Sequence, residues 1–281
     1  MQPIVAVIAP GMMGSGVAGR LTQNGIEVRT ALGGRSEASA RRAKDAGMVG
    51  VSDAQIAVCD FILSIVPPGQ AQGLANRLTP ALRGAANKPI YVDCNAVNPA
   101  TVLRIARTIE ETGATFVDGG IIGGPPTPGS KGTKLYVSGP AASRVGELEK
   151  YGLEVRVQPG PIGAASAMKM SYAGITKGFT ALGAAMMLAA ARAGTTDALR
   201  AEISASQPAL HGWLTRQMPR MYSKAYRWVA EMEEISGFVG EDPAAAQFFQ
   251  AAARLYERIA ADHEGKGAEC AALDAFCEPK A

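Results

Sequence analysis

The sequence is poor in the residues that build metal, redox and disulfide sites. It contains only two histidines, and none of its four cysteines has a spacing typical of a metal or redox motif. These cysteines are Cys59, Cys94, Cys270 and Cys277. We therefore predict reduced thiols and no metal site.

Charge is also sparse, and long apolar runs are absent. The formal net charge is only +3, and lysine and arginine are scattered, so we expect no nucleic-acid partner.

The most apolar later segment, Phe179 to Ala191, is shorter than the roughly 18 to 20 residues that span a bilayer. We interpret it as a buried helix and expect no membrane partner. The N-terminal residues lack the pattern of a signal peptide, which predicts a cytoplasmic location.

Short apolar runs alternate with helical patterns up to about residue 157, as parallel strands joined by crossover helices do. We expect strands at 4–8, 27–31, 61–66, 90–93, 116–118, 135–138 and 154–157. We expect helices at 14–24, 36–46, 71–82, 99–112 and 141–151. Residues 159–163 break the pattern, and everything strongly periodic after them is helical. The prediction is an α/β Rossmann domain with a mostly parallel, doubly wound sheet over residues 1–160, followed by an all-α domain over residues 161–281. The tail after Asp262 loses its periodicity, so we expect partial order there at best.

A glycine-rich turn follows the first strand directly and opens the first helix. It reads Ala9-Pro10-Gly11-Met12-Met13-Gly14, a G-x-G-x-x-G fingerprint with alanine at its first glycine. Gly11 lets the backbone approach a pyrophosphate, and Gly14 lets helix and strand pack closely. The free N–H groups of the helix N-terminus then suit the anion. We predict dinucleotide binding through Gly11, Met12, Met13 and Gly14, the alternative being a plain strand-to-helix turn.

The end of the second strand distinguishes the two nicotinamide cofactors. NAD-binding proteins usually carry a carboxylate there for the ribose hydroxyls, whereas this chain reads Thr30-Ala31-Leu32-Gly33-Gly34-Arg35-Ser36. Arg35 suits a bidentate contact with a 2′-phosphate, and Ser36 can cap the next helix and donate to the same group. We therefore expect NADP(H) rather than NAD(H). An ordinary solvated Arg35 is the alternative.

Several segments resemble the β-hydroxyacid dehydrogenases, which include 3-hydroxyisobutyrate and 6-phosphogluconate dehydrogenases. Residues 118–124, Asp-Gly-Gly-Ile-Ile-Gly-Gly, resemble the family's substrate-loop motif D-x-x-V-S-G-G. Residues 163–169 resemble G-x-G-x-x-x-K, in which the lysine is catalytic, here Lys169. The resemblance further implies cofactor contacts from Val66, Pro67 and Pro68 and from Asn95. Residues 220–235 are similar to a poorly characterised branch of this superfamily.

The chain departs from that family pattern where a substrate would bind. The motif serine is replaced by Ile122, the asparagine four residues after the lysine by Ala173, and a late lysine by Glu233. We expect substrate contacts from both domains: Ile122, Gly123, Gly124, Lys169, Tyr172, Ala173, Lys177, Trp213 and Glu233. Fold and cofactor follow from the resemblance more directly than the substrate does.

Lys169 also stands out without the resemblance, because it begins a narrow polar stripe on an otherwise apolar helix. The residues of that face are Lys169, Tyr172, Ala173, Thr176, Lys177 and Thr180. A lysine desolvated near the second cation Lys177 should have a lowered pKa and exchange protons. We predict that Lys169 is the general acid and base, while Tyr172 and Asn95 orient the reacting oxygen. The alternative is a lysine whose stem packs and whose ammonium reaches water.

Together these features predict hydride transfer between NADP(H) and a small hydroxy or carbonyl compound. An imine or ketone reductase and a non-catalytic NADP-binding sensor are the alternatives.

The long helix carries small residues on several sides, which permits close packing all round. They lie at 173–174, 178, 183–185 and 189–191. Because the resemblance also implies intertwined subunits, we expect a homodimer formed through the helical domain.

Overall fold

The computed structural model describes residues 2–278 and confirms the expected fold class. Its sheet has the order β3-β2-β1-β4-β5-β6-β7-β8, and every neighbouring pair is parallel except β6 and β7. The strands are β1 (Val5–Ile8), β2 (Val28–Thr30), β3 (Val49–Gly50), β4 (Phe61–Ser64), β5 (Ile90–Asp93), β6 (Thr115–Ile122), β7 (Lys134–Ser138) and β8 (Glu154–Val157). The ends of β1, β4 and β5, where parallel strands place ligand-binding loops, therefore lie next to one another.

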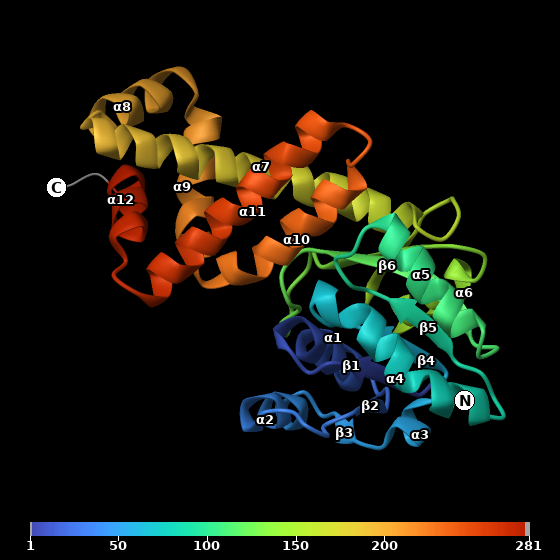
Figure 1. Cartoon of the computed structure of the whole chain (residues 1–281). Helices are drawn as coiled ribbons and strands as arrows, with labels where there is room; N and C mark the ends of the chain where they lie inside the picture. Colours follow the sequence, from blue (N-terminus) through green and yellow to red (C-terminus); the bar gives the residue numbers. More distant parts are fainter. Residues whose placement is uncertain (1, 279–281) are drawn as a thin grey trace. The chain divides into compact units, whose positions relative to one another are not determined.

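Helices cover both faces of this sheet (Figure 1). They are α1 (Met12–Gln23), α2 (Glu37–Asp45), α3 (Asp53–Ile56), α4 (Ala71–Gly84), α5 (Pro99–Glu110) and α6 (Ala142–Gly146), with short 3₁₀ turns η1 (Pro68–Gln70) and η2 (Glu147–Tyr151). Alternate side chains of β1 explain the layering: Val5 and Val7 pack with α1, α2 and α6, whereas Ala6 and Ile8 pack with α4 and α5. Strands that are buried on both faces have continuous apolar sequences. This is why these strands could be predicted from the sequence.

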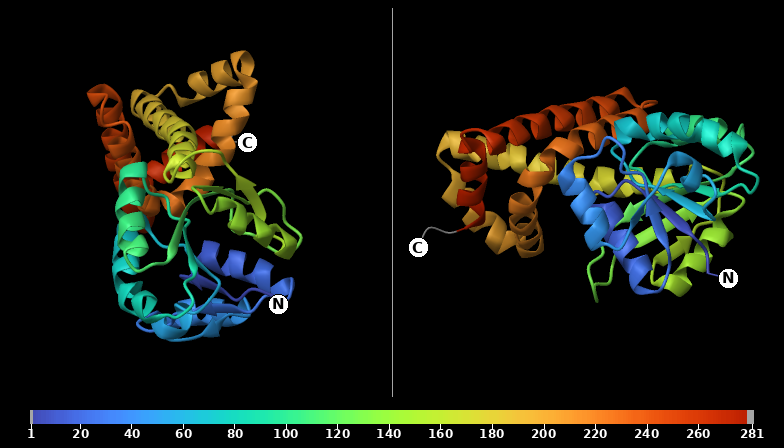
Figure 2. Two further views of the ribbon diagram at one scale, coloured as in Figure 1. Left: turned by 90° about the vertical axis from the view of Figure 1, so that its right-hand side faces the viewer. Right: turned by 90° about the horizontal axis from the view of Figure 1, so that it is seen from below.

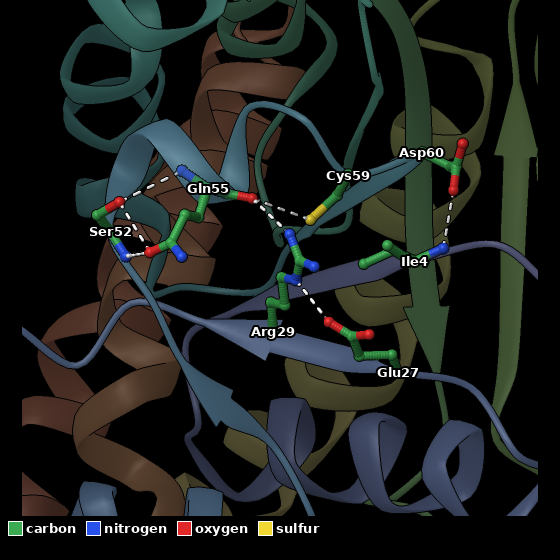
Figure 3. A network of polar contacts seen from close by, with 7 residues as sticks. All are labelled: Ile4, Glu27, Arg29, Ser52, Gln55, Cys59 and Asp60. Atoms are coloured by element: carbon green, nitrogen blue, oxygen red, sulfur yellow. Dashed lines mark hydrogen bonds and ion pairs between the residues drawn. The ribbon is translucent and has the colours of Figure 1, made fainter.

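The short elements β3 and α3 were not predicted, because neither is long enough to show periodicity. β3 pairs with β2, and a polar network holds α3 in place (Figure 3). Ser52 and Gln55 form a capping box at the start of α3, and Arg29 donates to the Gln55 carbonyl oxygen at 3.2 Å and to Glu27 at 2.7 Å. Cys59 lies beside this network, and burial raises its pKa to about 11. Cys59 is therefore a structural thiol.

The second part of the chain is helical throughout, as expected. Its elements are α7 (Ala164–Ala193), α8 (Thr196–Ser206), α9 (Pro208–Met221), η3 (Tyr222–Lys224), α10 (Ala225–Phe238), α11 (Pro243–Glu264) and α12 (Ala268–Cys277). Helices α10 and α11 run side by side (Figure 2). The expectation of little order after Asp262 is wrong for residues up to 278. Asp262 accepts the Cys270 N–H, and Leu273 and Phe276 are fully buried, so this short helix is held by its contacts rather than by its own periodicity.

The chain divides into two compact units, and the division falls after Met170, within α7. Within the described residues α7 is the one helix that is long and apolar enough to cross a membrane, and half of its most apolar window is buried inside the protein. The core helix of a soluble protein has the same properties.

Candidate functional site

The glycine-rich turn between β1 and α1 has the geometry that a dinucleotide needs. A Cβ atom at Gly14 would lie 2.0 Å from the Ala9 carbonyl oxygen, whereas one at Gly11 would meet nothing within 4 Å. Gly14 is therefore required for the turn to close, and Gly11 faces open space. No side chain caps the first turn of α1, so its backbone N–H groups are available to an anion. Gly11, Met12 and Met13 lie at this helix end, as predicted from the sequence.

The loop from β2 to α2 carries Arg35, and α2 itself carries Arg42; neither guanidinium group has a carboxylate partner among the described residues. Arg35 lies just before Ser36, which caps α2 by accepting the Ser39 N–H at 3.3 Å. Arg42, one turn into α2, donates to the Pro10 carbonyl oxygen at 3.0 Å and to the Ser39 hydroxyl at 3.0 Å. Sequence reasoning did not select Arg42, because only the fold brings it against the glycine-rich turn. The uncapped start of α1 and the Arg42 guanidinium group thus lie close together, an arrangement that suits an anion.

Asn95 shapes the neighbouring loop, which follows β4. Its side chain is 2 % exposed, its amide oxygen accepts the Val66 N–H at 2.7 Å, and its amide nitrogen donates to Ser64 at 2.8 Å. Val66 is followed by Pro67 and by Pro68, the first residue of η1. The structure thus brings Asn95 and the Val66–Pro68 loop together at adjacent strand ends. In this arrangement the Asn95 amide orients the loop.

Lys169 lies against the end of β6, next to the strand that carries Asn95. Its ammonium group donates to the Ile121 carbonyl oxygen at 2.6 Å, immediately before Ile122, Gly123 and Gly124. Gly123 has φ +120°, and a Cβ atom there would lie 2.5 Å from the Gly132 carbonyl oxygen. Lys169 and the predicted substrate loop are therefore neighbours, as the sequence indicated.

The loop from Gly123 to Thr133 is anchored on α1. Arg20 donates to the carbonyl oxygens of Thr127, at 2.9 Å, and Ser130, at 2.8 Å. A cavity of about 350 Å³ lies beneath the loop, with Leu63, Ile65, Cys94 and Ile121 among its lining residues. These four side chains come from the ends of β4, β5 and β6, or from the residue just beyond. Burial raises the pKa of the Cys94 thiol well above its ordinary value, so Cys94 supplies apolar surface rather than a nucleophile.

The other predicted substrate residues lie in the second compact unit. Lys177 forms an ion pair with Glu231, and its ammonium group lies 5.0 Å from the centre of the Trp228 ring. Burial lowers the pKa of Lys177, although Glu231 opposes that shift. Glu233, which we aligned with a family lysine, is exposed. The carboxylate that faces Lys177 is therefore Glu231, two residues earlier.

Three further predicted residues of that unit differ in exposure. Tyr172 is 49 % exposed, whereas Ala173 is buried. Trp213 packs on Phe179, with ring centres 5.3 Å apart. The nearby Tyr222 is buried, and its hydroxyl donates to Asp274 at 2.8 Å. Tyr222 therefore belongs to the helical core.

Residues 4–149 match the model of the NAD binding domain of 6-phosphogluconate dehydrogenase, and residues 190–259 match a domain of unknown function, DUF1932. An uncharacterized 28.5 kDa protein of Methanothermus fervidus is 32% identical over 176 residues. That match covers 62% of this chain and 66% of the relative's length, which is just under two thirds.

Solved structures share this fold. A conserved protein of unknown function, described as structurally similar to 3-hydroxyacid dehydrogenases, is 30% identical with a TM-score of 0.66 over 90% of this chain and 98% of its own. The 3-hydroxyisobutyrate dehydrogenase of Mycobacterium tuberculosis, solved with L-serine, is 16% identical with a TM-score of 0.70 over 99% and 100%. An imine reductase from Myxococcus stipitatus, solved with NADP+, is 18% identical with a TM-score of 0.57 over 98% and 100%. The last two likenesses show a common fold.

The cofactor-domain match covers more than half of the chain, and it contains the glycine-rich turn and every strand from β1 to β7. The chain therefore belongs to the family of NAD(P)-dependent oxidoreductases that is built on the NAD binding domain of 6-phosphogluconate dehydrogenase.

Proposed function

We propose that this protein transfers a hydride between NADP(H) and a small hydroxy or carbonyl compound, with Lys169 as the general acid and base. The observation that carries this proposal is the position of the Lys169 ammonium group, 2.6 Å from the carbonyl oxygen of Ile121. That position is the start of the substrate loop, on the strand that pairs with β5, and Asn95 follows β5 by two residues. A lysine placed there can exchange a proton with an oxygen bound at the loop.

The first compact unit has the features that a nicotinamide dinucleotide requires. Open space at Gly11 and the uncapped N-terminus of α1 suit the pyrophosphate. Arg35, Ser36 and Arg42 suit a 2′-phosphate, since the end of β2 carries no carboxylate for ribose hydroxyls. These residues support NADP(H) over NAD(H). When bound, the cofactor supplies or accepts the hydride.

The protein's own residues handle the proton. In reduction, the Lys169 ammonium group donates a proton to the substrate oxygen, while the substrate carbon receives the hydride. In oxidation, the neutral amine of Lys169 takes the hydroxyl proton as the hydride leaves. Asn95 keeps the Val66–Pro68 loop in place, and Tyr172 is a second group that we propose orients the reacting oxygen.

Reduction of a ketone or a cyclic imine is the second candidate function. Ile122 and Ala173 place apolar groups at positions where the resembled dehydrogenases have polar ones, and one solved structure with this fold is an imine reductase with NADP+. A less charged substrate would suit these residues.

The test has two parts. Binding of NADPH and NADH is first measured by fluorescence titration at one fixed salt concentration. Consumption of NADPH is then followed with aldehydes, ketones and cyclic imines, and formation of NADPH with hydroxy acids and neutral alcohols. Turnover of a carbonyl or hydroxy compound supports the first function, and turnover of imines alone supports the second. Binding of NADPH with no turnover of any class would indicate a sensor and contradict both.

A further inference from the structure

Asp118 lies fully buried in β6, and its carboxylate accepts four hydrogen bonds. The donors are the Gly163 N–H at 2.9 Å, the Ser166 N–H at 3.0 Å, the Ser166 hydroxyl at 2.5 Å and the Ser138 hydroxyl at 2.9 Å. Two of these donors belong to the backbone at the start of α7. Asp118 therefore caps a helix that lies about 45 residues further along the chain.

The same strand also determines where the first turns of α7 can lie. A Cβ atom at Gly120 would be 3.0 Å from the Lys169 Cβ and 3.2 Å from the Ala165 carbonyl oxygen. A side chain at this position would push the helix back by a few tenths of an ångström, so glycine permits the close packing of helix on strand. One residue further on, the Ile121 carbonyl oxygen receives the Lys169 ammonium group. Two consecutive residues of β6, Gly120 and Ile121, thus contact the residue that we propose exchanges the proton.

Ser138 extends this arrangement to the next strand. Its hydroxyl donates to Asp118 and accepts the Ala165 N–H at 2.9 Å. The N–H groups of Gly163, Ala165 and Ser166 are thereby all satisfied by side chains of β6 and β7. A buried N–H group that loses its acceptor costs about 1 to 3 kcal/mol, so the helix would shift or fray without this carboxylate.

We propose that Asp118 is the positioning residue for Lys169: it caps α7 and so holds the lysine at the substrate loop. The inference rests on the role proposed for Lys169. Asp118 acts through the helix and not on the substrate. A displacement of about 1 Å in a reacting group can cost about 100-fold in rate, so loss of the cap should lower kcat.

The test compares two substitutions of Asp118. Asp118→Ala removes all four acceptor interactions, and we expect kcat to fall about 100-fold. Asp118→Asn keeps one oxygen for the α7 N–H groups, and its amide can donate to the Ser166 hydroxyl, so it should retain most of kcat. Affinity for NADPH should stay unchanged in both, because the glycine-rich turn lies on another strand. Amide hydrogen exchange at Gly163 and Ser166 should accelerate in Asp118→Ala.

A matched control separates positioning from loss of stability. Val117→Ala removes buried apolar contacts from the same strand, on the face that packs with α1, and should lower the melting temperature while kcat is retained. If Asp118→Ala does not fold, Ser166→Ala and Ser138→Ala, which each remove one contact, should lower kcat less steeply. Wild-type kcat in the foldable variants would overturn the proposal. An equal loss of kcat in Val117→Ala and Asp118→Ala would also overturn it. The same holds if Asp118→Asn loses as much kcat as Asp118→Ala. A Lys169→Met variant that keeps its rate would instead contradict the proposed function.

Discussion

At the scale of single residues, chemistry depends on side chains whose partners are many positions away in the sequence. Lys169 contacts the carbonyl oxygen of Ile121, and Arg42 contacts that of Pro10. Lys169 was predictable because it matches the lysine of the resembled family and because a lysine in an apolar segment is unusual. Arg42 was not, since nothing in a charged helix such as α2 distinguishes one arginine from another.

Replacing the lysine tests the proposed chemistry. We expect Lys169→Met to lower kcat by about 100-fold or more, because loss of a general acid or base typically costs 10² to 10⁴ in rate. NADPH affinity should hardly change. The measurement is single-turnover oxidation of NADPH with a substrate found in the panel. A variant that keeps more than about a tenth of the wild-type rate would show that Lys169 is structural.

Replacing the arginine before α2 tests the choice of cofactor. Wild-type protein should bind NADP+ at least about tenfold more tightly than NAD+, since a charge-assisted phosphate contact contributes about 1.5 to 3 kcal/mol. Arg35→Ala should remove most of this difference and leave NAD+ affinity unchanged. Arg41→Ala, on the exposed side of α2, is the matched control and should keep the preference. Equal affinities of the wild type for both cofactors would contradict the prediction.

At the scale of elements, α7 combines roles that its sequence shows only in part. Its first turns carry Lys169, and further along the helix Lys177 is paired with Glu231 from α10. The spacing of Lys169 and Lys177 predicted a shared polar face. It could not reveal that the second lysine already has a carboxylate partner, because that partner comes from another helix.

The paired lysine leads to a prediction about stability. Lys177→Met and Glu231→Gln should each lower the free energy of unfolding by roughly 3 kcal/mol, because each leaves one buried charge without its partner. The double variant should lose clearly less than the sum of the two. Urea denaturation of the four proteins measures this coupling. Strictly additive losses would mean that the pair contributes nothing.

At the scale of the whole molecule, α7 also exposes an apolar stripe. Its large side chains, each 43 to 73 % exposed and spaced alternately four and three residues apart, are Ile175, Phe179, Leu182 and Met186. Such a seam, flanked by small residues, is suited to packing against a second helix of the same kind. We propose that a second copy of this chain covers it, which agrees with the homodimer expected from the small residues.

Light scattering at micromolar concentration should accordingly give the mass of a dimer. Leu182→Glu should shift the protein toward monomer, because it places a charge in the apolar seam. Val58→Glu, at a similarly exposed position of the first unit, should leave the dimer intact. A wild-type monomer would rule out this assembly.

Substrate choice is a further property to test on the whole protein. We expect 3-hydroxyisobutyrate to be a poor substrate. Ile122 and the buried Ala173 supply no polar group for a carboxylate, and a buried carboxylate without partners costs several kcal/mol. Neutral carbonyl compounds or cyclic imines should react faster. Steady-state assays decide this: a kcat/KM near 10⁴ M⁻¹s⁻¹ or above for the hydroxy acid, about the lower end of the ordinary enzyme range, would contradict the expectation.

The sequence by itself determined the features that depend on local pattern. Continuous apolar strands, helical periodicity after residue 163 and the turn at Gly11 and Gly14 were sufficient for the fold and the cofactor domain, because hydrophobic period and glycine conformation act within a few residues. Only the tertiary structure decided what depends on distant partners. It placed four donors on Asp118, paired Lys177 with Glu231 and brought Arg42 to Pro10. It also made α12 a buried helix, because the packing of Leu273 and Phe276 compensates for a weak local signal.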